Sequence, residues 1–464
     1  MSAWKVLAFL VLFWLGICGD IQAQTEPGVA PITIVGIDWS IEGRVRQSYV
    51  ASTANIEVGR VFVRQSLLDA YLKDCAQRLW NLRLFDEVLI TETVIDQGTT
   101  GQALLAQVSV RVKESGTFIV LPGASGNDSQ GFAVSAATDI YDFLGTGGEL
   151  QFGLARTWAP PGSGLNIVGG EVSIPGYAGP VSWMGTAFVK PRVSDLGDFD
   201  LRASCGLSVT VPLVDRGGEQ QLALVPSYSV DAAWGTISDL QGHPGLSLQF
   251  GRIDWHQNRR SGYLLDLAYV QGVPLSSVET ITGQRVGMSV GTGLEGRWPN
   301  YALTGSVHAL AGSGGEAMAS ASLRWSPGGD TNLGTGVRGI DPGRLDGEAG
   351  AYCSSDFWWN LGPFVFSRWL GMRWLRIFDV EVHAGPFLDA ALPVSKISAG
   401  VDFSRLRFGT GLQIQSYALY SRPFYLYTAI GFDLRAAIAS GTVLGNAADG
   451  YPIASLTSAI GVRY

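Results

Sequence analysis

Over most of its length, this chain places apolar residues at every second position, with glycine or polar residues between them. Residues 408–415 show the pattern: Phe, Thr, Leu and Ile fall on one face of a strand, and Gly, Gly, Gln and Gln fall on the other. Residues 286–295 and 424–435 repeat it. Because successive side chains of a β-strand point to opposite faces, the pattern predicts many short strands with one apolar face each.

Two all-β architectures satisfy this alternation. In a transmembrane barrel the apolar face points outward to lipid, and the lumen face can be polar or small. In a secreted soluble sandwich or propeller the apolar face points inward. The composition favours the barrel, because only 16% of the residues are charged, 61 of 464 are Gly, and no apolar run follows the N-terminus that reaches the ~20 residues of a membrane helix.

The N-terminus predicts an export signal over residues 1–23. Lys5 provides a positive charge, residues 6–17 are apolar but short for a span, and Ala23 is a suitable residue before cleavage. A retained anchor helix is the alternative.

Known catalytic and ligand-binding patterns are missing from the sequence. The four histidines have no second metal ligand at a recognised spacing, and neither a G-x-S-x-G nor a phosphate-binding loop occurs. The net charge of −8 without a basic stripe argues against nucleic acid as a partner. We therefore expect no enzyme, no cofactor and no metal. The cysteines, of which the first would leave with the signal, are too scattered for a dense disulfide framework; they are Cys18, Cys75, Cys205 and Cys353.

After a linker over residues 24–30, residues 31–115 predict a small α+β domain. Its expected elements are a strand at 32–37, a short helix at 46–54, a longer helix at 65–81, and strands from 85 to 90 and from 104 to 112. Two helices can bury their apolar stripes on one face of a three-stranded sheet. Residues 116–464 are then the barrel.

The last strand has Ile460, Val462 and the terminal Tyr464 on one face. A terminal aromatic strand is typical of bacterial outer-membrane barrels, although a soluble β fold can also end on such a strand.

Several motifs occur in one order along the chain. Val337-Arg338-Gly339-Ile340 follows a Gly-rich segment, and Phe387-x-Asp389-x-Ala391 comes later. The remaining motifs are Ile32-x-Ile34-x-Gly36, Gly59, the block at 84–88, Val110-x-Val112-x-Glu114, the block at 139–148, and the strand at 350–357 that carries Asp356. With them, the mature chain resembles the outer-membrane assembly factors of the BamA/TamA type, a family that includes two-partner secretion transporters.

The resemblance implies a fold and a site. It predicts a mainly β protein with one POTRA domain before an antiparallel transmembrane barrel of about 16 strands, and it places 139–148 at the turn after the first barrel strand. Residues 337–340 match the V/I-R-G-F/Y signature of a loop that folds back into the lumen, with Ile340 in place of the aromatic residue. Residues 387–391 match F-x-D-x-G, with Ala391 in place of Gly.

We hypothesise that Arg338 bonds Asp389, and also Asp356, inside the barrel, because a buried guanidinium needs carboxylate partners. Strand parity agrees: if Val380 and Val382 face lipid, then Glu381, His383 and Asp389 face the lumen. In the alternative, Arg338 lies in a solvated surface loop and the acids are unrelated.

The function implied by the resemblance is insertion of other proteins into the bacterial outer membrane, with the POTRA domain receiving unfolded substrate in the periplasm. The expected partners are membrane lipids, unfolded outer-membrane proteins, and periplasmic or lipoprotein accessory factors. The family's general assembly factors carry several POTRA domains and this chain has one, so two alternatives stay open. One is a dedicated exporter of a single partner protein, and the other is a passive pore or structural surface protein.

A segment rich in tryptophan and arginine, residues 357–378, has two interpretations. It is either a small amphipathic turn that touches lipid headgroups or, the interpretation we favour at this point, a pair of strands with their aromatic girdle. The residues in question are Trp358, Trp359, Trp369, Trp374, Arg368, Arg373 and Arg376.

Overall fold

The structure is a computed structural model of the chain. It describes residues 31–462 except for 97–103, 128–130, 160–162, 179, 196–197, 216–220, 235–238, 257, 276–282, 296–300, 314–329, 332–333, 336, 341–344, 346–348, 396, 421–423 and 451. The predicted export signal lies outside the described residues.

The N-terminal part of the chain contains a four-stranded sheet and two helices. The strand order is β2-β1-β4-β3, and β1 pairs antiparallel with β2. The predicted helices and strands are confirmed, whereas the two-residue β2, too short to give a periodic pattern, was not predicted. The elements are β1 (Ile32–Glu42), α2 (Gln47–Ala54), β2 (Val61–Phe62), α3 (Gln65–Asn81), β3 (Phe85–Asp96) and β4 (Leu104–Glu114).

Two compact units divide the chain. The first comprises the residues up to Ile37 together with Glu57–Ala70 and Glu92–Val108. The second comprises Asp38–Ile56, Tyr71–Thr91 and Ser109–Tyr464. The contacts described below all lie within the second unit.

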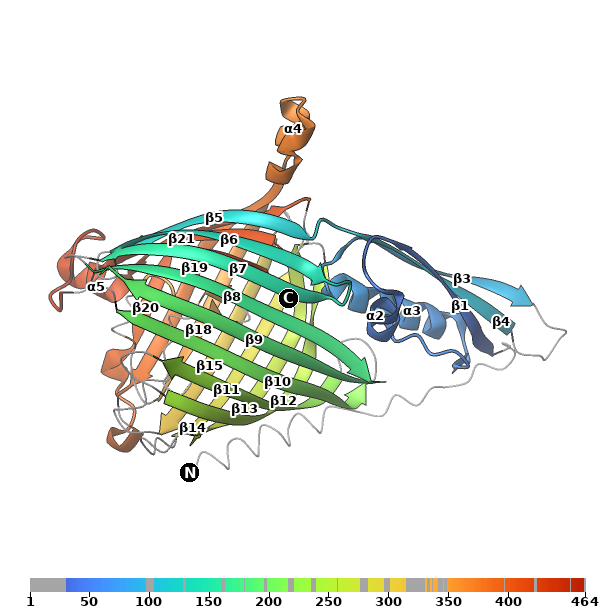
Figure 1. Ribbon diagram of the computed structural model, residues 1–464, viewed down its shortest axis with the longest axis horizontal. Helices are drawn as coiled ribbons and strands as arrows, with labels where there is room; N and C mark the ends of the chain where they lie inside the picture. Colours follow the sequence, from blue (N-terminus) through green and yellow to red (C-terminus); the bar gives the residue numbers. More distant parts are fainter. Residues whose placement is uncertain are drawn as a thin grey trace. The chain divides into compact units, whose positions relative to one another are not determined.

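A 16-stranded antiparallel sheet dominates the second unit, and Figure 1 shows that it curls round on itself. Each strand pairs with the next along the chain, so the order runs from β22 to β5. A two-stranded hairpin, β16 (Asp330–Thr331) with β17 (Gly334–Thr335), lies in the connection between β15 and β18. The strands are β5 (Phe118–Asn127), β6 (Gly131–Phe143), β7 (Gly148–Ala159), β8 (Ser163–Ala178), β9 (Val181–Ser194), β10 (Phe199–Asp215), β11 (Gln221–Trp234), β12 (Asp239–His256), β13 (Arg259–Pro274), β14 (Gly283–Glu295), β15 (Tyr301–Ser313), β18 (Ala349–Phe364), β19 (Val380–Val394), β20 (Arg407–Ala418), β21 (Phe424–Asp433) and β22 (Ala454–Val462).

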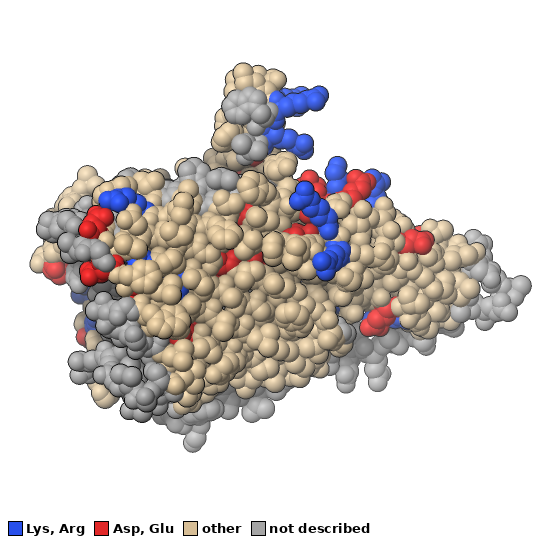
Figure 2. Space-filling model, viewed as in Figure 1, with Lys and Arg blue, Asp and Glu red and all other residues tan. Residues whose placement is uncertain are grey.

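The two faces of this sheet have opposite chemistry. On β20, Leu412 is 69% exposed whereas its neighbour Gln413 is 1% exposed. On β19, Leu388 is exposed and Asp389 is buried. Figure 2 shows a broad area of the outer face without charged side chains. Apolar residues outside and polar residues inside are the arrangement of a barrel that faces lipid, and the reverse of a sandwich.

Because neighbouring strands are antiparallel, the connections alternate between two ends of the sheet. We call the end at which β5 begins the near end and the opposite end the far end. The connections after β6, β8, β10, β12, β14, β18 and β20 lie at the near end, and the others lie at the far end.

Two predicted strand segments are helical instead. The pattern at 424–435 predicted a strand to Arg435, but β21 ends at Asp433, whose carboxylate accepts a hydrogen bond from the Ala436 backbone N–H (3.0 Å) and so caps α5 (Leu434–Ser440). The strand pair favoured for 357–378 is also wrong beyond Phe364. That segment continues as α4 (Phe366–Trp369) and the 3₁₀ helix η2 (Arg373–Phe378); further 3₁₀ turns are η3 (Ile397–Ala399) and η4 (Phe403–Arg405). Among the described helices, none has the length and hydropathy needed to cross a membrane.

Candidate functional site

The far-end connection between β15 and β18 turns inward at residues 337–340. Arg338 is 5% exposed and Ile340 is 2% exposed, so this part of the connection is buried rather than solvated. The alternative of a surface loop around Arg338 is therefore wrong.

Arg338 is held by Asp389 through three hydrogen bonds. Its backbone N–H donates to Oδ2 (2.8 Å), Nε donates to the same oxygen (2.9 Å), and Nη2 donates to Oδ1 (2.5 Å). The two side-chain bonds have the parallel fork geometry that makes Arg–carboxylate pairs directional. Because the Asp389 carboxylate also accepts from the Arg338 backbone N–H, it fixes the main chain of the loop as well as the arginine side chain.

The remaining guanidinium nitrogen is satisfied by three strands. Nη1 donates to Asp356 Oδ1 (2.5 Å) on β18, to Gln413 Oε1 (2.5 Å) on β20 and to the Tyr427 hydroxyl (3.1 Å) on β21. Gln413 Nε2 in turn donates to Asp356 Oδ1 (3.0 Å). The Phe387 ring lies 4.2 Å from the guanidinium carbon. The structure thus brings together the predicted Arg338, Asp356 and Asp389, and adds Gln413 and Tyr427, which the sequence did not single out.

The electrostatics of this cluster keep Arg338 charged. Burial alone would lower the pKa of Arg338, but the Asp356 and Asp389 carboxylates raise that pKa well above its usual value. One cation and two anions with several further hydrogen bonds satisfy the condition under which buried charges are tolerated.

Glycines let the loop lie directly on the sheet. A Cβ atom at Gly409 would lie 1.8 Å from the Arg338 carbonyl oxygen, and a Cβ atom at Gly431 would lie 3.0 Å from Gly339 Cα. Gly339 itself has φ +75°, in the left-handed region that glycine adopts at no steric cost. The periodic pattern identified Gly409 and Gly431 only as small inner-face residues, because close approach depends on the loop's position.

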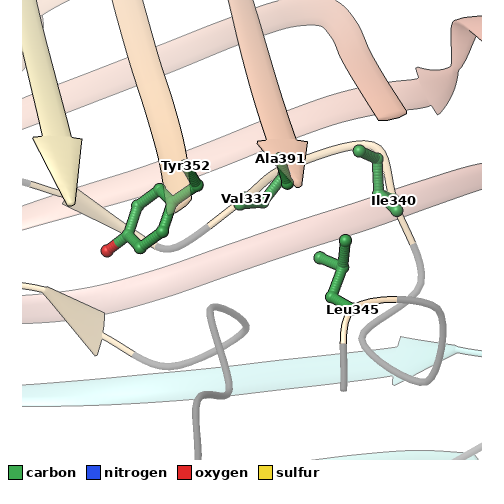
Figure 3. Packing of buried hydrophobic residues seen from close by; sticks show 5 residues of the cluster. All are labelled: Val337, Ile340, Leu345, Tyr352 and Ala391. Atoms are coloured by element: carbon green, nitrogen blue, oxygen red, sulfur yellow. The ribbon is translucent and has the colours of Figure 1, made fainter. Parts of the chain in front are cut away.

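An apolar cluster also packs the loop against the strands. Figure 3 shows Val337, Ile340 and Leu345 of the loop with Tyr352 of β18 and Ala391 of β19. Leu345 is fully buried. Ile340, in place of an aromatic residue, and Ala391, in place of Gly, both lie in this cluster. The loop is therefore held by burial of apolar side chains as well as by ion pairs.

A second polar network lies on the inner wall at the near end. Glu381 of β19 accepts hydrogen bonds from the side-chain amides of Asn258 (2.7 Å) and Asn360 (2.6 Å), and its Oε1 lies 2.8 Å from His383 Nε2. The strand parity argument predicted that Glu381 and His383 face inward with Asp389, and this is confirmed.

Arg83, which follows α3, reaches this network. Its Nη2 donates to Asn258 Oδ1 (2.6 Å), and its guanidinium carbon lies 4.3 Å from the Trp255 ring centre and 5.0 Å from that of Tyr417. Arg83 is 2% exposed and has φ +54°, unusual for a residue with a Cβ. No periodic pattern includes a single residue between a helix and a strand, so Arg83 could not be identified from the sequence.

The turn at 139–148 is displaced by one strand from its expected place. It follows β6, the second strand of the large sheet, because 118–127 and 131–143 form a hairpin before it. Within the turn, the Gly147 N–H donates to Asp142 Oδ1 (2.6 Å), and the Gly145 carbonyl accepts from the Arg46 N–H (2.9 Å).

The C-terminal strand is described in part. Ile460 and Val462 lie on β22 opposite Leu426 and Phe424, in register with β21. Tyr464 lies outside the described residues. Of the cysteines in the described part of the chain, Cys75 is buried, and Cys205 and Cys353 are exposed.

Neither a protein-family model nor a curated protein sequence matches the chain. Solved structures do. CdiB from Acinetobacter baumannii is 12% identical with a TM-score of 0.58, over 93% of this chain and 74% of that chain. CdiB from Escherichia coli is 12% identical with a TM-score of 0.48, over 97% and 93%. BamA from Haemophilus ducreyi lacking POTRA domains 1–3 is 14% identical with a TM-score of 0.46, over 93% and 84%. The similarity to CdiB from A. baumannii confirms, at the level of the fold, the resemblance expected from the sequence.

Proposed function

We propose that this protein is an outer-membrane β-barrel that inserts other outer-membrane proteins. The observation that carries the proposal is the buried loop at Arg338, held by Asp389 and Asp356 against the inner wall. A barrel that served only as an open channel would gain nothing from the six hydrogen bonds of Arg338 that fix a far-end loop inside it. A loop fixed in this way instead keeps the inner wall in one shape while strands elsewhere rearrange.

The strand order supports a site for insertion. β5 and β22 stand at the two ends of the order, so closure of the barrel depends on the pairing of these two strands. A weak pairing there would let a substrate strand add to the exposed edge, where each new strand satisfies its backbone hydrogen bonds within the membrane.

The N-terminal sheet supports a site for substrate capture. β3 is an edge strand of that sheet and has 12 residues. Leu89 and Ile95 on β3 are exposed. An unfolded chain can add to such an edge by main-chain hydrogen bonds with little sequence preference. We assign this sheet and its helices the role of a POTRA domain in the periplasm.

The proposal includes no covalent reaction and no cofactor. Its partners are membrane lipids, unfolded outer-membrane proteins and accessory factors. A fold does not separate general assembly from dedicated export of one protein or from a passive pore, so the experiment must do so.

The test uses the full chain in phospholipid vesicles, with a urea-unfolded outer-membrane barrel as substrate and heat-modifiable electrophoretic mobility as the measure of folding. We expect faster substrate folding than in empty vesicles, and a smaller acceleration with Arg338→Ala. An equal rate of substrate folding in vesicles with and without the protein contradicts the assembly function. Ion conductance without any effect on folding favours the pore.

A further inference from the structure

The connection between β18 and β19 is unusually long for its end of the sheet. It spans residues 365–379 and contains α4 and η2, whereas the strand bounds leave five residues or fewer for each other near-end connection. In Figure 1, α4 stands clear of the wall of the sheet. We call residues 365–379 the projection.

The projection is held at its base by a buried acid. Asp379 is 4% exposed, and its carboxylate accepts hydrogen bonds from the Ser367 backbone N–H (2.8 Å) and hydroxyl (2.5 Å). The Asp379 carbonyl accepts from the Leu419 N–H (2.8 Å) of the neighbouring connection. These bonds join the two ends of the projection to each other and to the connection after β20, so the projection is a folded element.

Its outer part is apolar and exposed. Trp369 and Leu370 are each 61% exposed, and Met372 is 47% exposed. Trp369 packs edge-on against both Phe364 and Phe366, with ring centres 5.9 and 5.4 Å apart. An ordered group of large apolar side chains that the protein itself leaves uncovered indicates an interaction surface.

Three arginines surround this apolar group. Arg368, Arg373 and Arg376 are exposed, and none forms an ion pair with a described residue. The one acid of the projection, Asp379, is buried at the base. Figure 2 shows Lys and Arg atoms along one side of the projection. The surface therefore suits an anionic partner that also has an apolar part.

The projection continues the outer face of the sheet. Trp359 and Leu361 of β18 are exposed on that face, and the Phe364 ring at the end of the same strand contacts Trp369. If the outer face meets acyl chains, the same apolar surface leads without interruption onto the projection. Aromatic rings and arginines at the boundary of a hydrocarbon layer are the usual interfacial anchors.

We propose that the projection binds anionic phospholipid of the leaflet at the near end. Trp369, Leu370 and Met372 insert among the acyl chains, and the three arginines bind headgroup phosphates. This binding rests on the membrane placement of the sheet and not on the assembly activity. Of the two interpretations of residues 357–378, this surface supports the amphipathic turn that touches lipid headgroups and not the pair of strands.

The test places an environment-sensitive NBD fluorophore on Leu370→Cys in a Cys205→Ser, Cys353→Ser background, in which Cys75 is buried. The full chain is reconstituted in phosphatidylcholine vesicles with and without phosphatidylglycerol. Leu412→Cys on the outer face is the lipid control, and Ala448→Cys in the exposed far-end connection is the aqueous control.

We expect spin-labelled acyl chains to quench the label at 370 as they quench the label at 412, and iodide to quench only the label at 448. Phosphatidylglycerol should move the label at 370 further into the bilayer, which is measured as stronger quenching by the spin-labelled acyl chains. The triple change Arg368→Gln, Arg373→Gln and Arg376→Gln should remove that lipid dependence, whereas Arg111→Gln, on a half-exposed residue elsewhere, should leave it.

The controls separate the possible failures. A label at 412 that lipid does not quench overturns the membrane placement itself. A label at 412 in lipid with a label at 370 open to iodide overturns the projection proposal alone. Protection at 370 from both quenchers means that the projection packs against protein, which also overturns it.

Discussion

The Arg338 carbonyl oxygen occupies the space in which a side chain at Gly409 would begin, 1.8 Å from the ideal Cβ position. Gly409→Ala therefore has to push the loop off the inner wall. We expect a loss of unfolding free energy of about 1–3 kcal/mol, the usual cost of overpacking, measured by urea unfolding in vesicles. Gly153→Ala is the matched control, since its nearest neighbour would be 3.9 Å away. Equal effects at the two positions would show that the loop does not lie against Gly409.

Asp389 should matter more than Asp356 to the stability of the loop. Asp389→Ala removes all three of its bonds to Arg338, whereas Asp356→Ala leaves the fork intact. We expect Asp389→Ala to cost about 3–5 kcal/mol, because it leaves a buried cation with fewer partners. Arg111→Ala, whose pair with Glu42 is half-exposed, should cost less than about 1 kcal/mol.

A double-mutant cycle refines this result. If the pair acts as a unit, Arg338→Ala combined with Asp389→Ala should cost less than the sum of the single changes. Arg338→Lys should not rescue the loop, because an ammonium cannot make the fork. Full additivity, or a stable Arg338→Ala protein with unchanged activity, would contradict the conclusion that the Arg338–Asp389 pair holds the loop inside the sheet.

The fold and part of this site could be predicted because both depend on local patterns. The bounds of α3 at Gln65 and Asn81 follow from helical periodicity, and the inward direction of Asp389 follows from parity along one strand. Gln413 and Tyr427 could not be assigned to Arg338, because their positions depend on the register of β20 with β21. The end of β21 was missed because the alternation continues to Arg435, whereas capping by Asp433 starts a helix first.

Arg83 should stabilise the residues around it at the near end. Arg83→Ala removes a charged hydrogen bond to Asn258 and two cation–π contacts. We expect a loss of about 2–4 kcal/mol from these interactions. Hydrogen exchange over residues 71–91 should rise, and Arg60→Ala, which changes a partly exposed arginine outside that range, should leave that exchange unchanged. Unaltered exchange in Arg83→Ala would show that the contact carries no stability.

The cap at Asp433 predicts a local effect. Asp433→Ala should destabilise α5 by about 1 kcal/mol, the usual value of an N-cap. Because the Asp433 carboxylate also pairs with Arg407 at the start of β20 (3.5 Å), hydrogen exchange should increase over residues 434–440 and around Arg407, and it should stay constant in β10. Asp433→Asn keeps an acceptor for the Ala436 N–H and should restore most of the protection. If the strand continued to Arg435, Asp433→Ala and Asp433→Asn would instead show the same hydrogen exchange over residues 434–440.

The central claim, general assembly, is tested most directly by depleting the protein in its own cell and quantifying every other outer-membrane barrel. We predict that many barrels fall together while inner-membrane and periplasmic proteins do not. Loss of one secreted protein, or of none, would contradict the claim, and dedicated export or a passive pore would then account for the same fold.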